Sequence, residues 1–211
     1  TELAELHLRQ GRAAEAAELA RSAFEGLTAA VGSSHAETLR AARVLGEALV
    51  QRRDLPAAEL VLRAAVAALP EATTVGDGVR CQLLHSLGGV QRELRRPNDA
   101  LPLLQQAYEV SLRLPEGAAP VAERVARDYA FTLWSLGQAR NAVPVWRRVV
   151  QLVETRRGPD HQETLRACAN LGVNLLEGGE AALALETLQR AYAGLDGNPT
   201  FAWVGTAMVD A

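Results

Sequence analysis

The stretch 39–69, LRAARVLGEALVQRRDLPAAELVLRAAVAAL, contains two amphipathic patterns separated by a short polar segment, Arg52-Arg53-Asp54. In each half, apolar or small residues recur at the three- and four-residue steps of one helical face. The two faces are Leu39, Ala42, Leu45, Gly46 and Leu49, and then Leu55, Ala58, Leu62, Ala65, Val66 and Leu69. The polar segment is a tight turn, so the stretch predicts a pair of antiparallel helices.

The same pattern recurs through the chain at a fixed step of 42 residues, as from Ala16 to Ala58. Three ladders keep this register without insertion: Leu3-Ala4, Leu45-Gly46, Leu87-Gly88, Tyr129-Ala130 and Leu171-Gly172; Ala16, Ala58, Ala100, Ala142 and Ala184; and Phe24, Val66, Tyr108, Val150 and Tyr192. Helix pairs this regular cannot bury their apolar faces alone, so they stack into a solenoid. The sequence predicts an all-α solenoid of tandem antiparallel helix pairs forming one elongated domain.

The register also predicts where the repeats begin and end. We expect five helix pairs, at about 1–32, 33–74, 75–116, 117–158 and 159–195, followed by a partial sixth repeat or a terminal helix at 196–211. Thr1 and Ala211 are equivalent positions, so we expect the chain to be a segment of a longer protein. Small residues facing the second helix, such as Gly46 and Gly88, predict close approach of the two helices.

Composition disfavours several functions. The net charge of −3 over 211 residues argues against a nucleic-acid-binding domain, and no apolar run approaches the roughly 18 residues of a membrane span. Cys81 and Cys168 are too few for a disulfide framework or a zinc site. No phosphate loop, nucleophile motif or metal-ligand spacing is present. We therefore expect a cytoplasmic protein that is not an enzyme and needs no cofactor or metal.

Two loops between repeats, 32–40 (GSSHAETLR) and 158–166 (GPDHQETLR), contain helix-start signals. Ser34 and Asp160 are each followed three residues later by a glutamate, the pattern of a capping box. His35 and His161 lie beside these caps in the same register. We interpret both histidines as structural rather than catalytic.

These loops, with Leu45-Gly46, Leu49, Ala58, Leu62, Ala65 and Pro70, resemble the long tetratricopeptide repeats of the kinesin light chain type, which also occur in many bacterial proteins. The resemblance is weaker in the third and fourth copies, where 75–78 (VGDG) and 116–120 (EGAAP) replace the histidine loop. It implies a right-handed α-solenoid in which the first helix of each repeat lines a concave groove that binds proteins or peptides.

The residues expected on that groove are predominantly basic, with an aromatic pair. They are Arg40, Arg43, His85, Arg92, Arg124, Arg127, Phe131, Trp134 and Arg166. Arginine forms bidentate, charge-assisted bonds with carboxylates, and arginine beside aromatic anchors is typical of interface hot spots. We therefore predict a scaffold that binds a protein or peptide ligand, with a preference for acidic ones. Trp146, on the row of Leu62, Leu104 and Leu188, is predicted to be core.

Three alternatives remain open. The arginines could form local ion pairs, since Glu37–Arg40, Glu123–Arg127 and Glu163–Arg166 have helical pair spacing. The chain could be an accessory or sensor region of a larger bacterial signalling protein, such as a kinase, an NTPase switch or a transcriptional regulator. It could also form a homo-oligomer through solenoid ends that expose Leu3 and Leu6 or Val204 and Val209.

Overall fold

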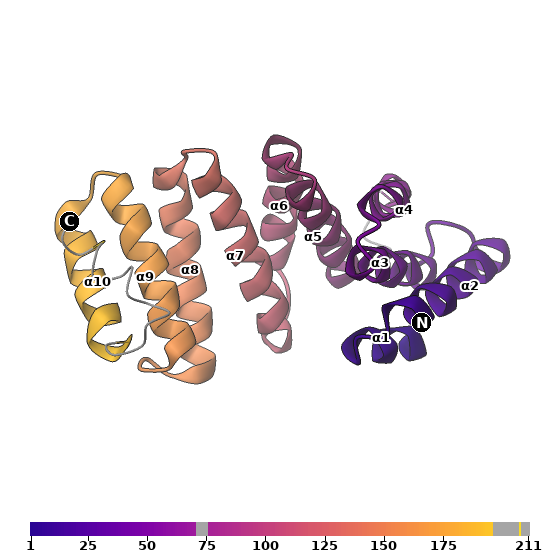
Figure 1. Ribbon diagram of the computed structural model, residues 1–211, viewed down its shortest axis with the longest axis horizontal. Coiled ribbons are helices and arrows are strands. Elements are labelled where there is room, and N and C mark those ends of the chain that lie inside the picture. Colours follow the sequence, from indigo (N-terminus) through magenta and orange to yellow (C-terminus); the bar gives the residue numbers. More distant parts are fainter. Residues whose placement is uncertain (71–75, 196–206, 208–211) are drawn as a thin grey trace. The chain divides into compact units, whose positions relative to one another are not determined.

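A computed structural model describes residues 1–70, 76–195 and 207 of the chain. This described part is helical apart from its turns and loops and contains no strand. Figure 1 shows the helices in chain order. They are α1 (Glu2–Arg9), α2 (Ala13–Val31), α3 (Ala36–Gln51), α4 (Leu55–Ala67), α5 (Asp77–Glu93), α6 (Pro97–Ser111), the 3-10 helix η1 (Glu116–Ala118), α7 (Ala119–Ser135), α8 (Ala139–Arg157), α9 (Gln162–Glu177) and α10 (Ala181–Leu195). The predicted all-α solenoid of tandem helix pairs is confirmed.

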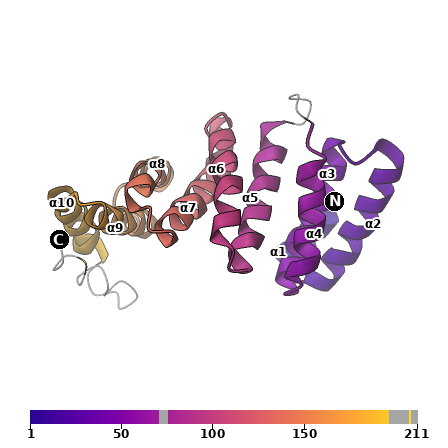
Figure 2. The ribbon, with the colours of Figure 1, turned by 90° about the horizontal axis from the view of Figure 1, so that it is seen from above.

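The chain divides into two compact units, Thr1–Pro115 and Glu116–Ala211, which we call the first and second units. In the first unit, α3 contacts α1, α2, α4 and α5, and α5 also contacts α6. In the second unit, α8 contacts α7 and α9, and α9 contacts α10 (Figures 1 and 2). Within each unit, therefore, helices that are neighbours in sequence pack together, as stacked hairpins do.

Close approach of paired helices depends on glycine at three equivalent positions. A Cβ added to Gly46, Gly88 or Gly172 would lie 2.6, 2.7 or 2.6 Å from Cγ of Leu62, Leu104 or Leu188, respectively. These leucines are fully buried. The predicted interlock of small residues against the second helix is therefore present. In the fourth pair the corresponding residues are Ala130 and Trp146, and Trp146 is 1% exposed, which confirms its core position.

The turn inside each helix pair requires a left-handed backbone. Gly137 supplies it in the fourth pair with φ of 71°. Arg53 and Arg95 occupy the equivalent position of the second and third pairs and are forced to φ of 63° and 60°. Residues with a Cβ are strained in this region, so these two turns store conformational energy.

The helix starts at α3 and α9 differ from the predicted capping box by one residue. The N-caps are His35 and His161, whose Nδ1 atoms accept hydrogen bonds from the amides of Glu37 and Glu163 at 3.3 and 3.2 Å. Ser34 and Asp160 are therefore not the caps, because each helix begins one residue later than the pattern suggests. The structural role predicted for the histidines is confirmed.

A threonine fixes each of these starts. The hydroxyl of Thr38 donates to the carbonyl of Gly32 at 2.8 Å, and that of Thr164 donates to Gly158 at 2.7 Å. Both threonines are fully buried. The bond closes the loop onto the first turn of the helix and leaves the histidine in extended backbone at the cap position.

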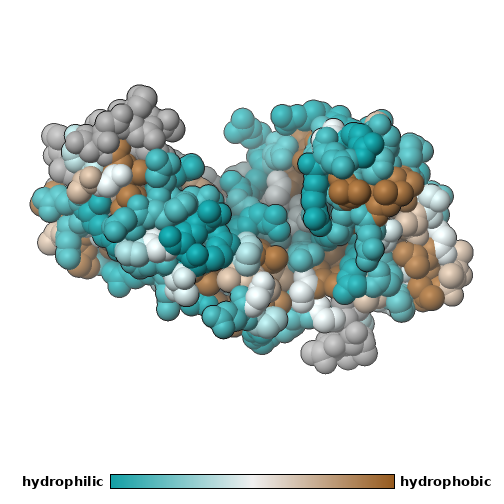
Figure 3. Space-filling model, turned by 90° about the horizontal axis from the view of Figure 1, so that it is seen from below, coloured by the Kyte–Doolittle hydropathy of each residue, from teal (hydrophilic) through white to brown (hydrophobic). Residues whose placement is uncertain are grey.

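The predicted sixth repeat, with Val204 and Val209, lies outside the described residues except for Ala207, and so do residues 71–75. The predicted repeat boundaries stay predictions. None of the described helices combines the length and apolar character that crossing a membrane requires. On the face shown in Figure 3, hydrophilic residues dominate and apolar residues form separate patches.

Candidate ligand-binding cleft on the first helices

All nine predicted groove residues lie on the first helices of their pairs. Four belong to the first unit, namely Arg40 and Arg43 on α3 and His85 and Arg92 on α5. Five belong to the second unit, namely Arg124, Arg127, Phe131 and Trp134 on α7 and Arg166 on α9. The two sets have different surroundings, and only the second contributes to a described cleft.

In the first unit, Arg43 is held by carboxylates of the protein itself. Its side chain is 14% exposed, and its two terminal nitrogens lie 2.5 Å from Glu5 on α1 and 2.8 Å from Glu47 on α3. Glu47 also accepts from the hydroxyl of Ser86 on α5 at 3.3 Å. Arg43 therefore connects neighbouring first helices, which fits a structural role better than ligand capture.

The other first-unit candidates are less enclosed. Arg40 is half exposed and pairs with Glu37 one turn earlier on α3. His85 and Arg92 are partly buried on α5. An exposed pair such as Glu37–Arg40 contributes only about 0.3–0.5 kcal/mol to helix stability, so a ligand can compete for Arg40 at little cost.

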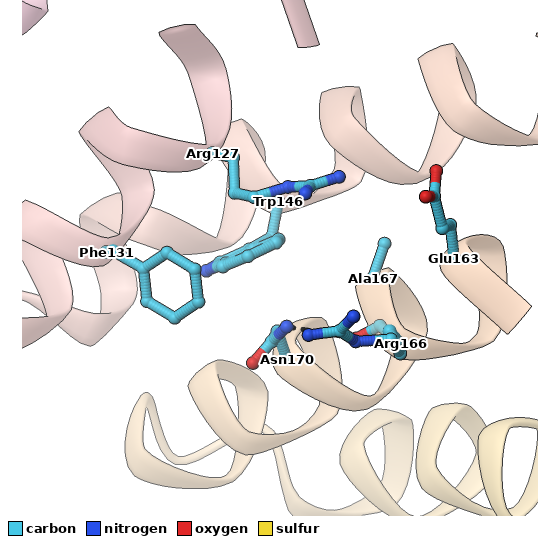
Figure 4. Close-up of a pocket in the computed structure, with 7 residues that line it drawn as sticks. All are labelled: Arg127, Phe131, Trp146, Glu163, Arg166, Ala167 and Asn170. Atoms are coloured by element: carbon cyan, nitrogen blue, oxygen red, sulfur yellow. Dashed lines mark hydrogen bonds between the residues drawn. The ribbon is translucent and has the colours of Figure 1, made fainter. Parts of the chain in front are cut away.

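In the second unit, three of the predicted residues meet at one cleft, which we call the α7–α9 cleft. Its volume is about 60 Å³. Figure 4 shows the lining side chains, which come from α7, α8 and α9: Arg127, Phe131, Trp146, Glu163, Arg166, Ala167 and Asn170. Arg124 and Trp134 are exposed on α7 and do not line this cleft.

The two arginines of the cleft are held differently. Arg127 pairs with Glu123, whose side chain is 8% exposed and also lies 2.6 Å from Arg156 on α8. Glu123 occupies the ladder position where Leu39, Cys81 and Leu165 stand in other repeats, so a buried carboxylate here fixes Arg127. Arg166 is exposed on α9. The guanidinium of Arg127 is thus held in place by a buried carboxylate, whereas the side chain of Arg166 is exposed to solvent.

The local ion pairs Glu37–Arg40 and Glu123–Arg127, which the sequence suggested, are present. Glu163 pairs with Arg157, at the end of α8, at 2.9 Å. The charged groups that line the cleft are therefore two arginines and one glutamate, a net charge of +1.

An aromatic pair closes one end of the cleft. The rings of Phe131 and Trp146 are 5.0 Å apart at 90°, an edge-to-face contact. In Figure 4 the nitrogen end of the indole lies toward Phe131. Within the described part of the chain, this buried Nε1 has no hydrogen-bond partner. An uncompensated buried donor costs about 1–3 kcal/mol, which an acceptor on a ligand could recover.

Sequence reasoning did not place four of the lining residues on the groove: Trp146, Glu163, Ala167 and Asn170. Trp146 was assigned to the core and also forms a wall of the cleft. Asn170 lies one helical turn after Arg166, and its amide donates to the carbonyl of Arg166 at 3.0 Å. The spacing of four residues from Arg166 was the signal that could have placed it on the same face. Ala167 carries no such signal.

Among the described residues, no group of three or more histidine, cysteine, aspartate or glutamate side chains could hold a metal ion. Both described cysteines, Cys81 and Cys168, are buried free thiols. The side chains that line the cleft offer hydrogen bonding, charge pairing and aromatic contact.

Tandem antiparallel helix pairs with a cleft on their first helices define a helical-repeat protein. The tetratricopeptide repeat family model matches residues 1–71 and 121–196, more than half of the chain. The chain belongs to the tetratricopeptide repeat family. Proteins of this family are generally scaffolds for protein interaction rather than enzymes.

Solved structures with the same fold include kinesin light chain-type repeats, which confirms the predicted resemblance. A chain described as kinesin light chain nearly identical TPR-like repeats, from Podosopora anserina, is 21% identical with a TM-score of 0.72, covering 94% of each chain. YrrB, described as having an unusual peptide-binding site, is 20% identical with a TM-score of 0.64, covering 97% of this chain and 89% of its own.

A Rap protein complexed with competence and sporulation factor is 16% identical with a TM-score of 0.59. The match covers 91% of this chain and 52% of the Rap chain. No curated protein matches this chain by sequence. At these identities the structural matches establish a shared fold.

Proposed function

We propose that this chain is a non-catalytic scaffold that binds a protein or peptide through its first helices, and that the α7–α9 cleft receives a carboxylate of the ligand. The observation that carries the proposal is the convergence of Arg127 and Arg166 on one small cleft. Guanidinium groups bind carboxylates with charge-assisted, often bidentate hydrogen bonds. The volume of about 60 Å³ suits one such group rather than a large side chain.

The division of roles between the arginines supports a single carboxylate. Arg127 is positioned by buried Glu123, so it loses little conformational entropy when a ligand binds. Arg166 is exposed and can close over the bound group. The net charge of +1, with Glu163 at the cleft, favours a monoanion over a densely charged polyanion.

The aromatic end of the cleft supports an adjacent contact. The indole nitrogen of Trp146 lacks a hydrogen-bond partner among the described residues and lies beside Phe131, so it would donate to a ligand carbonyl or carboxylate if Phe131 moved aside. Exposed Trp134, on the same helix one turn after Phe131, would then contact an apolar part of the ligand. This arrangement favours an acidic residue flanked by an apolar one.

Selection from an unbiased peptide library, at low and moderate salt, tests this function. The wild-type chain should enrich peptides with an acidic residue next to an apolar one. The Arg166→Glu variant should lose that enrichment, because it reverses the accessible cation. Arg21→Glu is the matched control, since Arg21 is exposed on α2, a second helix of the first unit. If the Arg166→Glu variant still enriches the same acidic peptides, the α7–α9 cleft is not the carboxylate-binding site.

A second candidate function is peptide sensing within a larger bacterial signalling protein. The likeness to a Rap protein bound to competence and sporulation factor, over 52% of the Rap chain, is the observation that favours it. Sensing requires a change of shape on binding, whereas scaffolding does not. Small-angle scattering with and without a selected peptide separates the two, since only a sensor should change its radius of gyration.

Self-association and location complete the proposal. Leu3 and Leu6 on α1 are 55% and 47% exposed, and burial of these side chains against a second copy would stabilise a homo-oligomer. A molecular mass independent of concentration would exclude this. We also propose a cytoplasmic location, which the two buried free thiols support.

A further inference from the structure

A second, larger pocket lies in the second unit between α8, α9 and α10. Its volume is about 400 Å³, and its residues are separate from those of the α7–α9 cleft. Cys168, Leu171 and Leu175 of α9 line it, and each is at most 8% exposed. Val150 of α8 also lines it, with 9% exposure. The pocket therefore has an apolar base of residues that belong to the core.

The register of the repeats explains why this space is empty. Val150 on α8 and Thr187 on α10 both line the pocket. Their equivalents in the first unit are the pairs Phe24 with Val61 and Val66 with Leu103, and all four side chains pack against the core there. Each first-unit pair contains one large side chain. The pair at the pocket contains two small ones, so the volume that Phe24 or Leu103 fills is left open.

Charged groups stand at the margin of the pocket. Arg147 of α8 is 56% exposed, and its nearest carboxylate, Glu180, is 3.8 Å away. Arg190 of α10 is held more firmly, at 2.7 Å from Glu154 and 3.3 Å from the carbonyl of Pro159. Glu186 of α10 also lines the pocket. Arg147 is therefore the cation most available to a bound anion.

Cys168 behaves as an apolar part of this surface. Burial raises the pKa of its thiol, so the thiol stays mostly protonated at neutral pH and reacts slowly with thiol reagents. A ligand would therefore meet an apolar surface below and a cation at the rim. Ligand pockets of about 300–1,000 Å³ with apolar walls and few polar groups are typical of small-molecule sites.

We propose that this pocket binds a small aromatic molecule that carries one anionic group, with its ring against Cys168 and Leu171 and its anion at Arg147. The chain itself indicates that an aromatic ring fits, because the position of Val150 is aromatic in three other repeats, at Phe24, Tyr108 and Tyr192. The inference is independent of the proposed peptide cleft, since the two sites share no lining residue.

Two free aromatic anions serve as probes of the full chain, 1-anilinonaphthalene-8-sulfonate and indole-3-acetate. Both should bind at one site per chain and compete with each other. Val150→Phe and Thr187→Leu restore the side-chain sizes of the first-unit pairs, so each should lower the affinity at least tenfold. Val150→Ala keeps the space open and should retain binding. Arg147→Gln should weaken binding severalfold at low salt and little at high salt.

Thiol labelling locates the bound probe. Saturating probe should slow the labelling of Cys168 more than that of Cys81, a buried thiol in the first unit that acts as an internal control. The proposal is overturned if neither probe binds, if both filling variants bind as the wild type does, or if Cys168 is not selectively protected. Helicity and melting temperature of each variant establish that it is folded.

Discussion

The rings of Phe131 and Trp146 meet edge to face, with centroids 5.0 Å apart and planes at 90°. This contact joins α7 to α8 and also closes one end of the α7–α9 cleft. One pair of side chains therefore serves both the packing of the second unit and the shape of its candidate binding site. Changes to either ring should affect stability and ligand binding together.

A double-mutant cycle with Phe131→Leu and Trp146→Leu should give a coupling energy of about 0.5–1.5 kcal/mol, because aromatic pairs contribute this much beyond burial. The free energy of unfolding of the four proteins in urea provides the measurement. Additive effects of the two substitutions would mean that the rings contribute only through their individual burial.

Adjacent glycines on α5 should respond in opposite directions. Gly88→Ala places a Cβ 2.7 Å from Leu104 and should lower the free energy of unfolding by about 1–3 kcal/mol through overpacking. Gly89→Ala meets nothing within 4 Å and should raise it by about 0.5–1 kcal/mol through helix propensity. The free energy of unfolding of both variants in urea is the measurement. Equal changes in the two variants would contradict the close packing of Gly88 against Leu104.

The strained turn at Arg95 should be relieved by glycine. Arg95→Gly should raise the free energy of unfolding by a few tenths to about 1 kcal/mol, because glycine adopts a positive φ without a Cβ clash. The reverse change at the equivalent turn, Gly137→Ala, should lower it by a similar amount. Thermal unfolding of both variants is the measurement, and Gly137→Ala separates the backbone effect from the loss of a surface charge because it changes no charge. A lower melting temperature for Arg95→Gly would refute the strain at this turn.

A carboxylate between repeats should make the first unit sensitive to acid. Glu59 on α4 accepts from the amide of Gln91 on α5 at 2.9 Å, and hydrogen bonds from Gln91 and Arg63 lower its pKa below the ordinary 4.5. A lowered folded-state pKa stabilises the fold fully above about 4.5, and this stability is lost as the pH falls through the lower, folded-state pKa.

In Glu59→Gln, the free energy of unfolding should therefore depend less steeply on pH below 4.5 than in the wild type. Above neutrality the two proteins should show nearly the same pH dependence. Urea midpoints from pH 7 to pH 3 provide the measurement. Asp54→Asn, which alters an exposed N-cap carboxylate of α4, is the comparison variant. If the urea midpoint of Glu59→Gln falls with decreasing pH as steeply as that of the wild type, groups other than Glu59 cause the acid sensitivity.

The helices were predictable because they depend on local periodicity and on ladders that the 42-residue register repeats. Gly46, Gly88 and Gly172 were recognisable as close-approach positions, since each faces a leucine at fixed spacing. The caps of α3 and α9 lie one residue after the predicted positions. His35 and His161 accept the glutamate amides that the preceding Ser34 and Asp160 were expected to bind.

The candidate site was predicted less completely because its pairings cross between helices. Arg43 was expected on a ligand surface, yet its partner Glu5 lies 38 residues earlier, and no spacing rule within one helix reveals such a contact. Glu123 binds Arg156 in the same way, 33 residues away. Trp146 was correctly assigned to the core, but burial alone did not show that its ring also lines a cleft.

The most direct test of the central proposal compares one selected acidic peptide with its amide counterpart, in which the acidic residue is replaced by glutamine or asparagine. Calorimetric titration of the wild type should give a lower affinity for the amide by at least about tenfold, as the loss of a charge-assisted contact predicts. Arg166→Glu should bind both peptides equally weakly. Equal affinity of the wild type for the two peptides would contradict carboxylate recognition at the α7–α9 cleft.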